Sequence, residues 1–376
     1  MLDIDELLRF AVEREASDLH IKVGSPPFVR LDGVLEPTPH DSVTPEDTDR
    51  IAAMIVPEAF TDRLDTAHDV DFAHSVPGLG RFRVSMFRQR GSIGLVLRRV
   101  TPGIPELEEL GLPPVARDFA EASSGLVLIT GPARSGKTTT LAAIVGHVNA
   151  HHRRHIVTIE DPIEILHRDR QSIVNQREVG TDTESYASAL KGALRQDPDV
   201  ILVGSIDESE AARAAVGAAG AGQLVLAAMP TLTPASTIKA IVEYFPTHLE
   251  HHARTMLSMC LRGIINQRLL VRSDGGGRAL ASEVLVVTAP AIDAISRGVE
   301  MEALPQVISE GDYWGMQSLD DSLLSLFEAG LVSKRDVIAN ATEPGDLRIA
   351  LERAAAPPLT GSEPALLSDH RPAESA

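Results

Sequence analysis

The stretch 126-LVLITGPARSGKTTTLAAIV-145 carries the clearest structural signal in this chain of 376 residues. Its apolar start predicts a buried strand, and its end predicts a helix. Between them, residues 131–138 fit the pattern G-x-x-x-x-G-K-[ST], in which backbone N–H groups and a helix N-terminus face phosphate groups. The stretch therefore predicts a phosphate-binding loop within an α/β domain.

The side chains of this loop indicate a nucleoside triphosphate bound with Mg²⁺. Lys137 would place a charge near the β- and γ-phosphates, and the Thr138 hydroxyl would hold the metal. Arg134 can either add a phosphate contact or be strained if the loop needs a positive φ there, and the sequence leaves both open. The predicted nucleotide-binding residues of the loop are Gly131, Pro132, Ala133, Arg134, Ser135, Gly136, Lys137, Thr138 and Thr139.

The composition argues against several classes of protein. A net charge of −18 disfavours a general nucleic-acid-binding surface, which needs basic residues to neutralise phosphates. The single cysteine, Cys260, cannot form an internal disulfide and is expected to be a buried helix residue in the reducing cytosol. The N-terminus carries acids where a signal peptide carries Lys or Arg, so export is not expected. Residues 211–229 predict a small-residue helix and a buried strand rather than a membrane span.

Periodic patterns divide the chain into two predicted domains. Residues 1–100 combine an amphipathic helix, a hairpin turn at Asp32-Gly33 and the alternating strand 81-RFRVSMF-87. Prolines and a glycine mark a linker at residues 101–105. In residues 106–355, the runs LVLIT, HIVTIE, VILVG and LVLAAM alternate with helical stretches, which predicts a parallel sheet covered by helices and a helical C-terminal region. Residues 356–376 are expected to form a disordered tail.

Four segments of the second domain occur in the order found in one known family. They are GPARSGKTTT at 131–140, TIEDPIE at 158–164, VNQREVGTDT at 174–183 and ALRQDPDVILVG at 193–204. With these segments the chain resembles the secretion ATPases of type II secretion and type IV pili, and within them the PilT/PilU retraction branch. One cysteine cannot supply the tetracysteine zinc site of the assembly branch, which also favours the retraction branch.

The resemblance implies an N-terminal PAS-like α+β domain followed by a RecA-like P-loop NTPase domain that binds ATP and Mg²⁺. It also implies a cytoplasmic hexameric ring, held at the inner face of the cell membrane by a platform protein, that drives pilus retraction and twitching motility. By the same resemblance, the acids Glu160, Asp161 and Glu164 lie near Mg²⁺ and the attacking water.

Three arginines of the N-terminal domain match family arginines that face the nucleotide across a domain or subunit cleft. They are Arg81, Arg83 and Arg98. An arginine in such a cleft stabilises charge on the transferring phosphoryl group. From strand alternation alone, a solvated sheet face explains these arginines slightly better.

The chain departs from the family at positions that act on water. The family reads G-E-M-R-D after its Walker B strand, whereas this chain reads GSIDE at 204–208. Ser205 therefore replaces the water-activating glutamate, and Asp207 replaces an arginine. The family's His box loses both histidines, to Gln223 and Pro230. A serine hydroxyl has no useful basicity at neutral pH, and general-base help is worth roughly 10²- to 10⁴-fold.

These departures favour a nucleotide-binding pseudo-ATPase with an accessory or regulatory role in a type IV pilus machine. It would form a homo-hexamer or a mixed ring with an active paralogue. Two alternatives stay open. One is an active retraction motor in which Asp207, Glu208 or Glu160 replaces the missing acid, and the other is a nucleotide sensor detached from pili.

His147, His151 and His155 are spaced at i, i+4 and i+8, which would place them on one helix face. A metal site is one interpretation of this spacing. A solvated polar cap at a helix end explains it better, because cations are stabilised near the negative end of a helix dipole.

Overall fold

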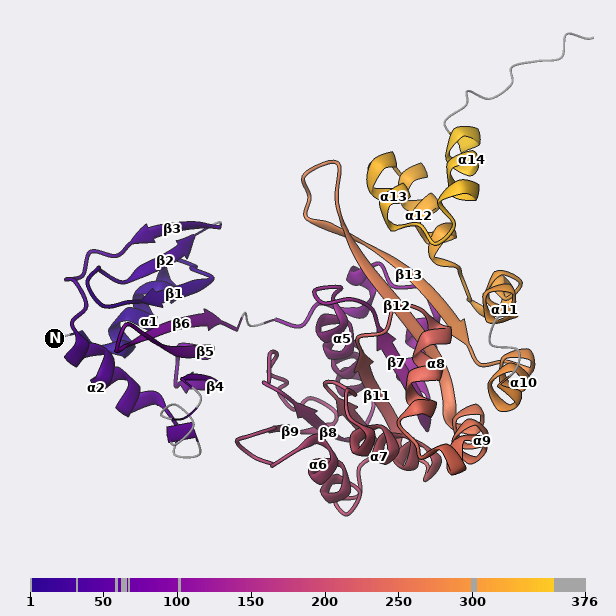
Figure 1. Ribbon diagram of the computed structural model, residues 1–376, viewed down its shortest axis with the longest axis horizontal. Helices are drawn as coiled ribbons and strands as arrows, with labels where there is room; N and C mark the ends of the chain where they lie inside the picture. The colour runs from indigo at the N-terminus through magenta and orange to yellow at the C-terminus, as the bar shows by residue number, and fades with distance from the viewer. Residues whose placement is uncertain are drawn as a thin grey trace, which may run out of the picture.

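A computed structural model of the chain describes residues 2–31, 33–57, 60–61, 66, 68–100, 103–298 and 303–354. These residues form two sheets, one within residues 18–99 and the other within residues 125–286 (Figure 1). The N-terminal sheet has six strands in the order β3-β2-β1-β6-β5-β4, and every neighbouring pair is antiparallel. Its strands are β1 (Asp18–Ile21), β2 (Phe28–Leu31), β3 (Val34–Pro37), β4 (Asp69–Val76), β5 (Gly80–Gln89) and β6 (Ser92–Arg99).

Two helices, α1 (Ile4–Glu13) and α2 (Pro45–Ile55), share one apolar cluster with this sheet. Asp3 caps α1, and Thr44 caps α2 through a reciprocal capping box. The predicted apolar faces are confirmed, since the following side chains are all buried: Leu7, Leu8 and Ala11 on α1, Leu2 just before it, and Phe82, Val84 and Met86 on β5. The β2–β3 hairpin also forms as predicted, although Asp32 lies outside the described residues.

The second sheet has seven strands in the order β13-β12-β7-β11-β10-β8-β9. All neighbouring pairs are parallel except β12 with β13. The four predicted aliphatic runs form β7, β8, β10 and β11, so the parallel sheet is confirmed. Its strands are β7 (Gly125–Thr130), β8 (His155–Glu160), β9 (Ile173–Glu178), β10 (Val200–Val203), β11 (Leu224–Met229), β12 (Leu261–Val271) and β13 (Arg278–Val286).

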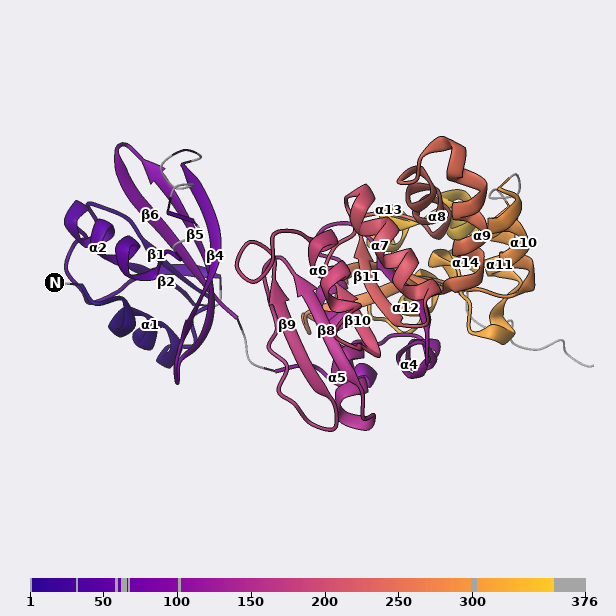
Figure 2. The ribbon, with the colours of Figure 1, turned by 90° about the horizontal axis from the view of Figure 1, so that it is seen from below.

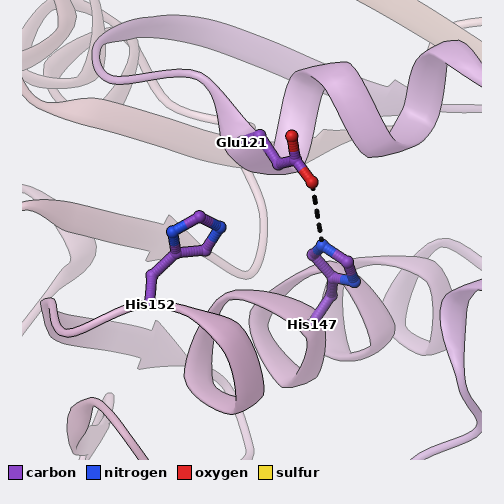
Figure 3. Close-up of side chains that lie close together, drawn as sticks. All are labelled: Glu121, His147 and His152. Carbon is purple, nitrogen blue, oxygen red and sulfur yellow. Dashed lines mark ion pairs between the residues drawn. The ribbon is translucent and has the colours of Figure 1, made fainter.

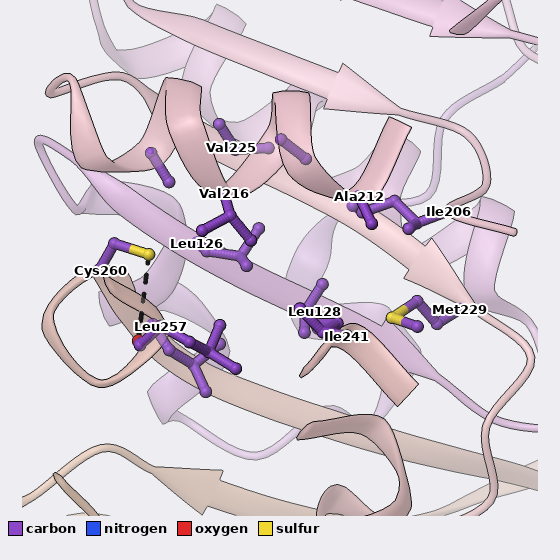
Figure 4. Packing of buried hydrophobic residues seen from close by; sticks show 14 of the residues in the cluster. Leu126, Leu128, Ile206, Ala212, Val216, Val225, Met229, Ile241, Leu257 and Cys260 are labelled. Atoms are coloured by element: carbon purple, nitrogen blue, oxygen red, sulfur yellow. Dashed lines mark hydrogen bonds between the residues drawn. The ribbon is translucent and has the colours of Figure 1, made fainter. Parts of the chain in front are cut away.

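Two apolar clusters lie on opposite faces of this sheet, because alternate residues of β7 and β11 belong to different clusters. One contains α4 and α5, and the other contains α6 to α11. Figure 4 shows part of the second cluster, where Leu126 of β7 packs near Val216 of α7 and Leu128 near Ile241 of α8. The helices are α4 (Val115–Glu121), α5 (Lys137–His151), α6 (Tyr186–Ala193), α7 (Ser209–Gly220), α8 (Pro234–Glu243), α9 (Glu250–Cys260), α10 (Ala289–Arg297) and α11 (Leu304–Ser309), with 3-10 turns η1 (Leu107–Leu110), η2 (Thr247–Leu249) and η4 (Asp312–Trp314).

Three further helices at the C-terminal end of the described residues pack on the β12–β13 hairpin through a separate apolar cluster. They are α12 (Leu319–Glu328), α13 (Lys334–Asn340) and α14 (Pro344–Ala354). The predicted helical region is therefore present. The predicted linker includes residues 101–102, and the predicted tail spans residues 356–376; both sets lie outside the described residues, and the domain boundaries stay predictions.

The small-residue segment 211–229 forms α7 and β11, as predicted. Within the described ranges, no helix combines the length and the apolar character that crossing a bilayer requires. Cys260 ends α9 as a buried residue, and burial raises the pKa of its thiol to about 11. It is therefore a packing residue and not an activated nucleophile.

Candidate functional site

The loop between β7 and α5 has a backbone that admits no side chain at its first residue. Gly131 has φ of 137°, and a Cβ placed there would lie 2.4 Å from the backbone oxygen of Gln267 on β12. Gly136 has φ of 92° and immediately precedes the first residue of α5. Both glycines are therefore required by the path of the loop. That path brings the loop to the N-terminus of α5, the geometry that binds anions.

Arg134 is in the left-handed region, with φ of 65°. A residue with a Cβ is disfavoured in this region by roughly 1–2 kcal/mol. The side chain is exposed, and among the described residues none forms an ion pair with it. The sequence left two roles for Arg134 open, and the backbone shows that the strained conformation is present.

The two side chains with predicted roles at the start of α5 are placed differently. The Lys137 ammonium donates to the backbone oxygens of Gly131 at 2.9 Å and Pro132 at 2.8 Å, and burial lowers its pKa. Thr138 is exposed. Lys137 therefore lies over the loop, where a phosphate oxygen would meet it, and the Thr138 hydroxyl is accessible to a metal ion.

Two polar residues of β12 form hydrogen bonds with residues on either side of the loop. The Gln267 side chain donates to the Thr140 hydroxyl at 2.8 Å, and the Asn266 side chain donates to the Thr130 hydroxyl at 2.8 Å. Both residues are fully buried. Sequence reasoning missed this support. The available signal was the polar pair inside the apolar run 261-LRGIINQRLLV-271, because buried amides need hydrogen-bond partners.

A small cavity of about 80 Å³ lies beside Thr138. The predicted acids reach it from the end of β8, and Ser205 reaches it from the end of β10. In register, β8 and β10 run parallel with Ile159 opposite Val203, so both strands end at the same edge. The cavity thus joins the metal-binding candidate to the acid box. Its polar lining comprises Thr138, Glu160, Asp161, Glu164, Tyr186 and Ser205.

Glu160 is the buried acid of this group, with 8% of its surface exposed. Its carboxylate accepts hydrogen bonds from Thr158 Oγ1 at 2.6 Å and Gln176 Nε2 at 3.1 Å. Burial raises its pKa, and the neighbouring Glu164 raises it further. Glu160 is therefore oriented by fixed partners, and its basicity is increased.

The residue between Ser205 and the acids that follow it is held in the core. Ile206 is buried in the core, and its N–H donates to the Ala228 oxygen at 2.8 Å. Asp207 and Glu208 beyond it are exposed, and Glu208 precedes α7. Asp207 and Glu208 are not among the residues that line the cavity with Ser205, although Asp207 is close enough to act on the charge of Tyr186.

Tyr186 was not identified from the sequence, but its hydroxyl lines the acid cavity. A Cβ on Gly204 would lie 3.2 Å from this hydroxyl. Burial raises the Tyr186 pKa, and Asp161 and Asp207 raise it further. The tyrosine is therefore a neutral hydrogen-bonding group among acids.

Two of the three predicted arginines reach the second domain. Figure 2 shows β4 and β5 on the side of the N-terminal sheet that faces β9. Arg83 lies 3.9 Å from the Glu164 carboxylate, and Arg81 forms an ion pair with Glu178 on β9. Glu178 is 3% exposed and accepts a hydrogen bond from the Ile163 N–H at 2.9 Å. Arg81 and Glu178 thus brace the acid box from behind, and sequence reasoning gave Glu178 no role.

Arg98 is placed elsewhere. Its guanidinium donates to Asp18 at 2.8 Å, within the N-terminal sheet. In this chain it therefore serves the N-terminal domain, while any contact across a subunit cleft stays a prediction.

The two altered His-box positions lie at opposite ends of β11. Gln223 precedes the strand, and its backbone oxygen accepts from the Gly125 N–H at the start of β7. Pro230 follows the strand at the edge that carries the phosphate loop. Six strand residues span about 20 Å. The expectation that both changes fall in one catalytic shell is wrong for Gln223.

Comparison with known proteins identifies the family of the chain. Residues 2–308 match the model of the type II/IV secretion system protein family. The type IV pilus ATPase PilU of Pseudomonas aeruginosa is 38% identical over 351 residues, which cover 93% of this chain and 92% of that protein. The type IV pilus retraction ATPase PilT of the same organism is 39% identical over 347 residues, covering 91% of this chain and 99% of that protein.

Solved structures support the same assignment. The pilus retraction motor PilT with bound ADP superposes with a TM-score of 0.85 at 40% identity, covering 93% of this chain and all of that chain. The Legionella pneumophila ATPase DotB, with a TM-score of 0.80 at 24% identity, covers 93% of this chain and 95% of that chain and supports the fold alone. The predicted α/β fold, an N-terminal domain followed by an ATPase domain, is confirmed. The chain belongs to the type II/IV secretion system protein family, and its similarity to PilT and PilU is close.

Proposed function

We propose that the chain is an ATP- and Mg²⁺-binding subunit of a type IV pilus machine whose own hydrolysis is impaired. The similarity to type IV pilus ATPases supports a role in a type IV pilus machine. The PilT structure with bound ADP supports an adenine nucleotide as the ligand. The impairment rests on one observation: Ser205 lines the cavity beside Thr138 where the family places a glutamate. A hydroxyl cannot deprotonate water at neutral pH.

The residues present fit ATP and Mg²⁺. The Gly131 backbone, the Lys137 ammonium and the N-terminus of α5 would hold the phosphates. The Thr138 hydroxyl, beside Glu160 and Asp161, would hold Mg²⁺, which when bound neutralises phosphate charge. In this arrangement Arg81 and Arg83 position the acid box from the N-terminal domain.

The assembly is part of the same proposal. We infer a ring, either a homo-hexamer or a mixed ring with an active paralogue, in the cytoplasm at the inner face of the cell membrane. Its membrane contact would be a platform protein, without direct insertion. An accessory role in such a ring needs ATP binding, which locks subunit geometry, and does not need turnover by every subunit.

The test is a paired measurement of ATP binding and ATP turnover on the purified full chain. We expect the unaltered protein to bind ATP and to turn it over slowly, and Lys137→Ala to weaken ATP binding about 100-fold. Mass measurement with and without a non-hydrolysable ATP analogue reports ring formation. Rapid turnover by the unaltered protein, sensitive to Lys137→Ala, would contradict impaired hydrolysis.

One observation favours a second candidate, an active motor with Glu160 as base. Glu160 lines the same cavity as Ser205 and has a raised pKa. In that case turnover falls as the pH drops through the raised pKa, because the protonated carboxyl accepts no proton. Glu160→Gln would then abolish turnover at every pH while ATP binding persists.

A further inference from the structure

Three ligand-capable side chains converge at the end of α5 that lies away from the phosphate loop. Glu121 ends α4, His147 lies in the last turns of α5, and His152 directly follows that helix. Each offers one ligand atom, and these atoms lie within 4.8 Å of one another. Figure 3 shows the Glu121 carboxylate pointing toward the His147 ring, with the His152 ring beside them. Two separate parts of the chain, the end of α4 and the end of α5, thus supply one potential set of metal ligands.

This arrangement differs from the one that the histidine spacing predicted. His155 begins β8 and leaves the helix face, and His147 is 5% exposed instead of being part of a solvated cap. His151 is exposed on the helix, with its ring 4.4 Å from that of His147. The metal interpretation of the spacing is therefore wrong for His155, whose place His152 takes, while the exposed His151 and Arg153 at the end of α5 agree with a solvated polar cap.

The two histidines of the cluster present unsatisfied nitrogens. Within the described part of the chain, His147 Nε2 and His152 Nε2 are buried and have no hydrogen-bond partner. His147 Nε2 lies 3.6 Å from the Glu121 carboxylate, beyond hydrogen-bonding distance. Buried polar atoms without partners are uncommon in folded proteins and often mark a missing ion or water. Here the unpartnered atoms belong to residues that commonly bind metals.

The backbone around the cluster is held by side-chain hydrogen bonds. The Arg154 guanidinium donates to the Ala122 oxygen at 2.8 Å and to the Glu121 oxygen at 3.2 Å. The Ser172 hydroxyl donates to the His152 oxygen at 2.6 Å. These bonds tie the end of α4 and the end of α5 to one frame, so the three ligands are brought together before any ion binds.

We propose that Glu121, His147 and His152 form a binding site for Zn²⁺ or a similar transition metal ion. Two imidazoles and one carboxylate are a ligand set that Zn²⁺ accepts, with a fourth position left for water. Mg²⁺ prefers oxygen ligands and is not expected to bind here. Tetrahedral Zn²⁺ needs ligand atoms about 3.3 Å apart, and Glu121, whose side chain is 49% exposed, can move to close the set.

Other properties of the cluster agree with metal binding. Burial lowers the His152 pKa, and the neighbouring Arg154 lowers it further, which favours the neutral ring that metal binding requires. The ion would clip α4 to α5. Because His147 lies ten residues after Lys137 on α5, the site is about 15 Å along the helix from the phosphate loop and is distinct from it.

The test is a titration of the untagged full chain with Zn²⁺, followed by calorimetry, and with Co²⁺, followed by its visible absorption. We expect one equivalent of Zn²⁺ per chain, a tetrahedral Co²⁺ spectrum and a higher Tm in Zn²⁺. Glu121→Gln and His152→Ala should each weaken Zn²⁺ binding at least about 30-fold. Loss of an outer-shell partner costs roughly 10–100-fold in metal affinity, and loss of a direct ligand should cost no less than the upper part of that range. These variants are preferred to changes at His147, whose burial makes misfolding a risk.

Two histidine variants serve as matched controls. His151→Ala removes the exposed neighbour of His147, and His251→Ala removes an exposed histidine on α9. Both should leave one equivalent of Zn²⁺ bound with unchanged affinity. The proposal is overturned if no stoichiometric binding occurs, if Glu121→Gln or His152→Ala binds as tightly as the unaltered chain, or if His151→Ala abolishes binding.

Discussion

The loop after β7 and the loop after β10 leave the same edge of one sheet and present different chemistry. After β7, the backbone path, two positive-φ glycines, Lys137 and Thr138 form an anion-binding surface. After β10, Gly204 is followed by Ser205, and the next side chain, Ile206, is buried in the core. The first loop works through many groups that the fold fixes together. The second depends on one side chain at one position.

This difference explains how binding and hydrolysis can be separated in one fold. A phosphate-binding loop uses backbone N–H groups and a helix terminus that do not involve the end of β10, so a change after β10 leaves phosphate binding intact. Water activation requires one base within hydrogen-bonding reach of the water. A single replacement at the end of β10 therefore removes the second function while the first persists.

The largest expected effect is the loss of ATP affinity in Lys137→Ala. Hydrogen bonds to charged groups are worth roughly 1.5–3 kcal/mol each, so the Kd for ATP should rise about 100-fold. Equilibrium binding of a fluorescent ATP analogue measures it. Lys239→Ala is the matched control, because Lys239 lies on α8 with 71% of its side chain exposed. Equal ATP affinity in Lys137→Ala and the control would contradict the claim that the loop after β7 binds the phosphates.

The next effect concerns the brace behind the acid box. Arg81→Ala should lower the free energy of unfolding by about 2 kcal/mol, because Glu178 would keep a buried charge without its cation. Its remaining bonds, from the Ile163 N–H and the Thr181 hydroxyl, hold the loss below that of a fully isolated charge. Urea denaturation measures the change.

Arg83→Ala is the matched control for this brace, since it lies on the same strand. Arg83 and Glu164 are each almost half exposed and lie 3.9 Å apart, so their pair should contribute less than about 1 kcal/mol. If the two variants lose equal stability, the buried pair between Arg81 and Glu178 is not what holds the acid box.

Ser205→Glu tests the loop after β10 directly. We expect ATP turnover to rise about tenfold, which is less than the 10²- to 10⁴-fold typical of general-base catalysis. The gain is limited because Pro230 still follows β11 and because the buried Glu160 lines the same cavity and repels a second carboxylate. Steady-state phosphate release measures it.

Ser205→Gln is the control for this substitution, since a glutamine side chain has nearly the same shape as glutamate and no basicity. It should leave turnover unchanged. A similar rise in both variants would mean that size, and not an acid, limits turnover at the end of β10.

Sequence patterns were sufficient for the parts of the fold that depend on local periodicity. Strand alternation placed Phe82, Val84 and Met86 in the N-terminal core, and short aliphatic runs placed the central strands of the parallel sheet. The phosphate loop was also predictable, because its glycines, lysine and threonine are consecutive in the chain.

The sequence was insufficient where function depends on pairs that are distant in the chain. Arg81 and Glu178 are 97 residues apart, and Asn266 is 136 residues from Thr130. Gln223 and Pro230 look like neighbours in one motif, but an extended strand separates them by its full length. The end of α5 could not be placed within a few residues, which is why His155, the first residue of β8, was taken for a residue on the helix face.

The smallest effect is expected in the phosphate loop itself, at Arg134. Arg134→Gly should raise the free energy of unfolding by about 0.5–1 kcal/mol, because glycine relieves the left-handed backbone but adds freedom to the unfolded chain. Arg134→Ala keeps a Cβ and should give no such gain, so the pair separates backbone strain from side-chain charge. Denaturation without nucleotide measures both. An equal gain in stability in Arg134→Ala would mean that the arginine's charge, and not its backbone, is what destabilises the loop. A loss of stability in Arg134→Gly would show that the arginine stabilises the phosphate loop.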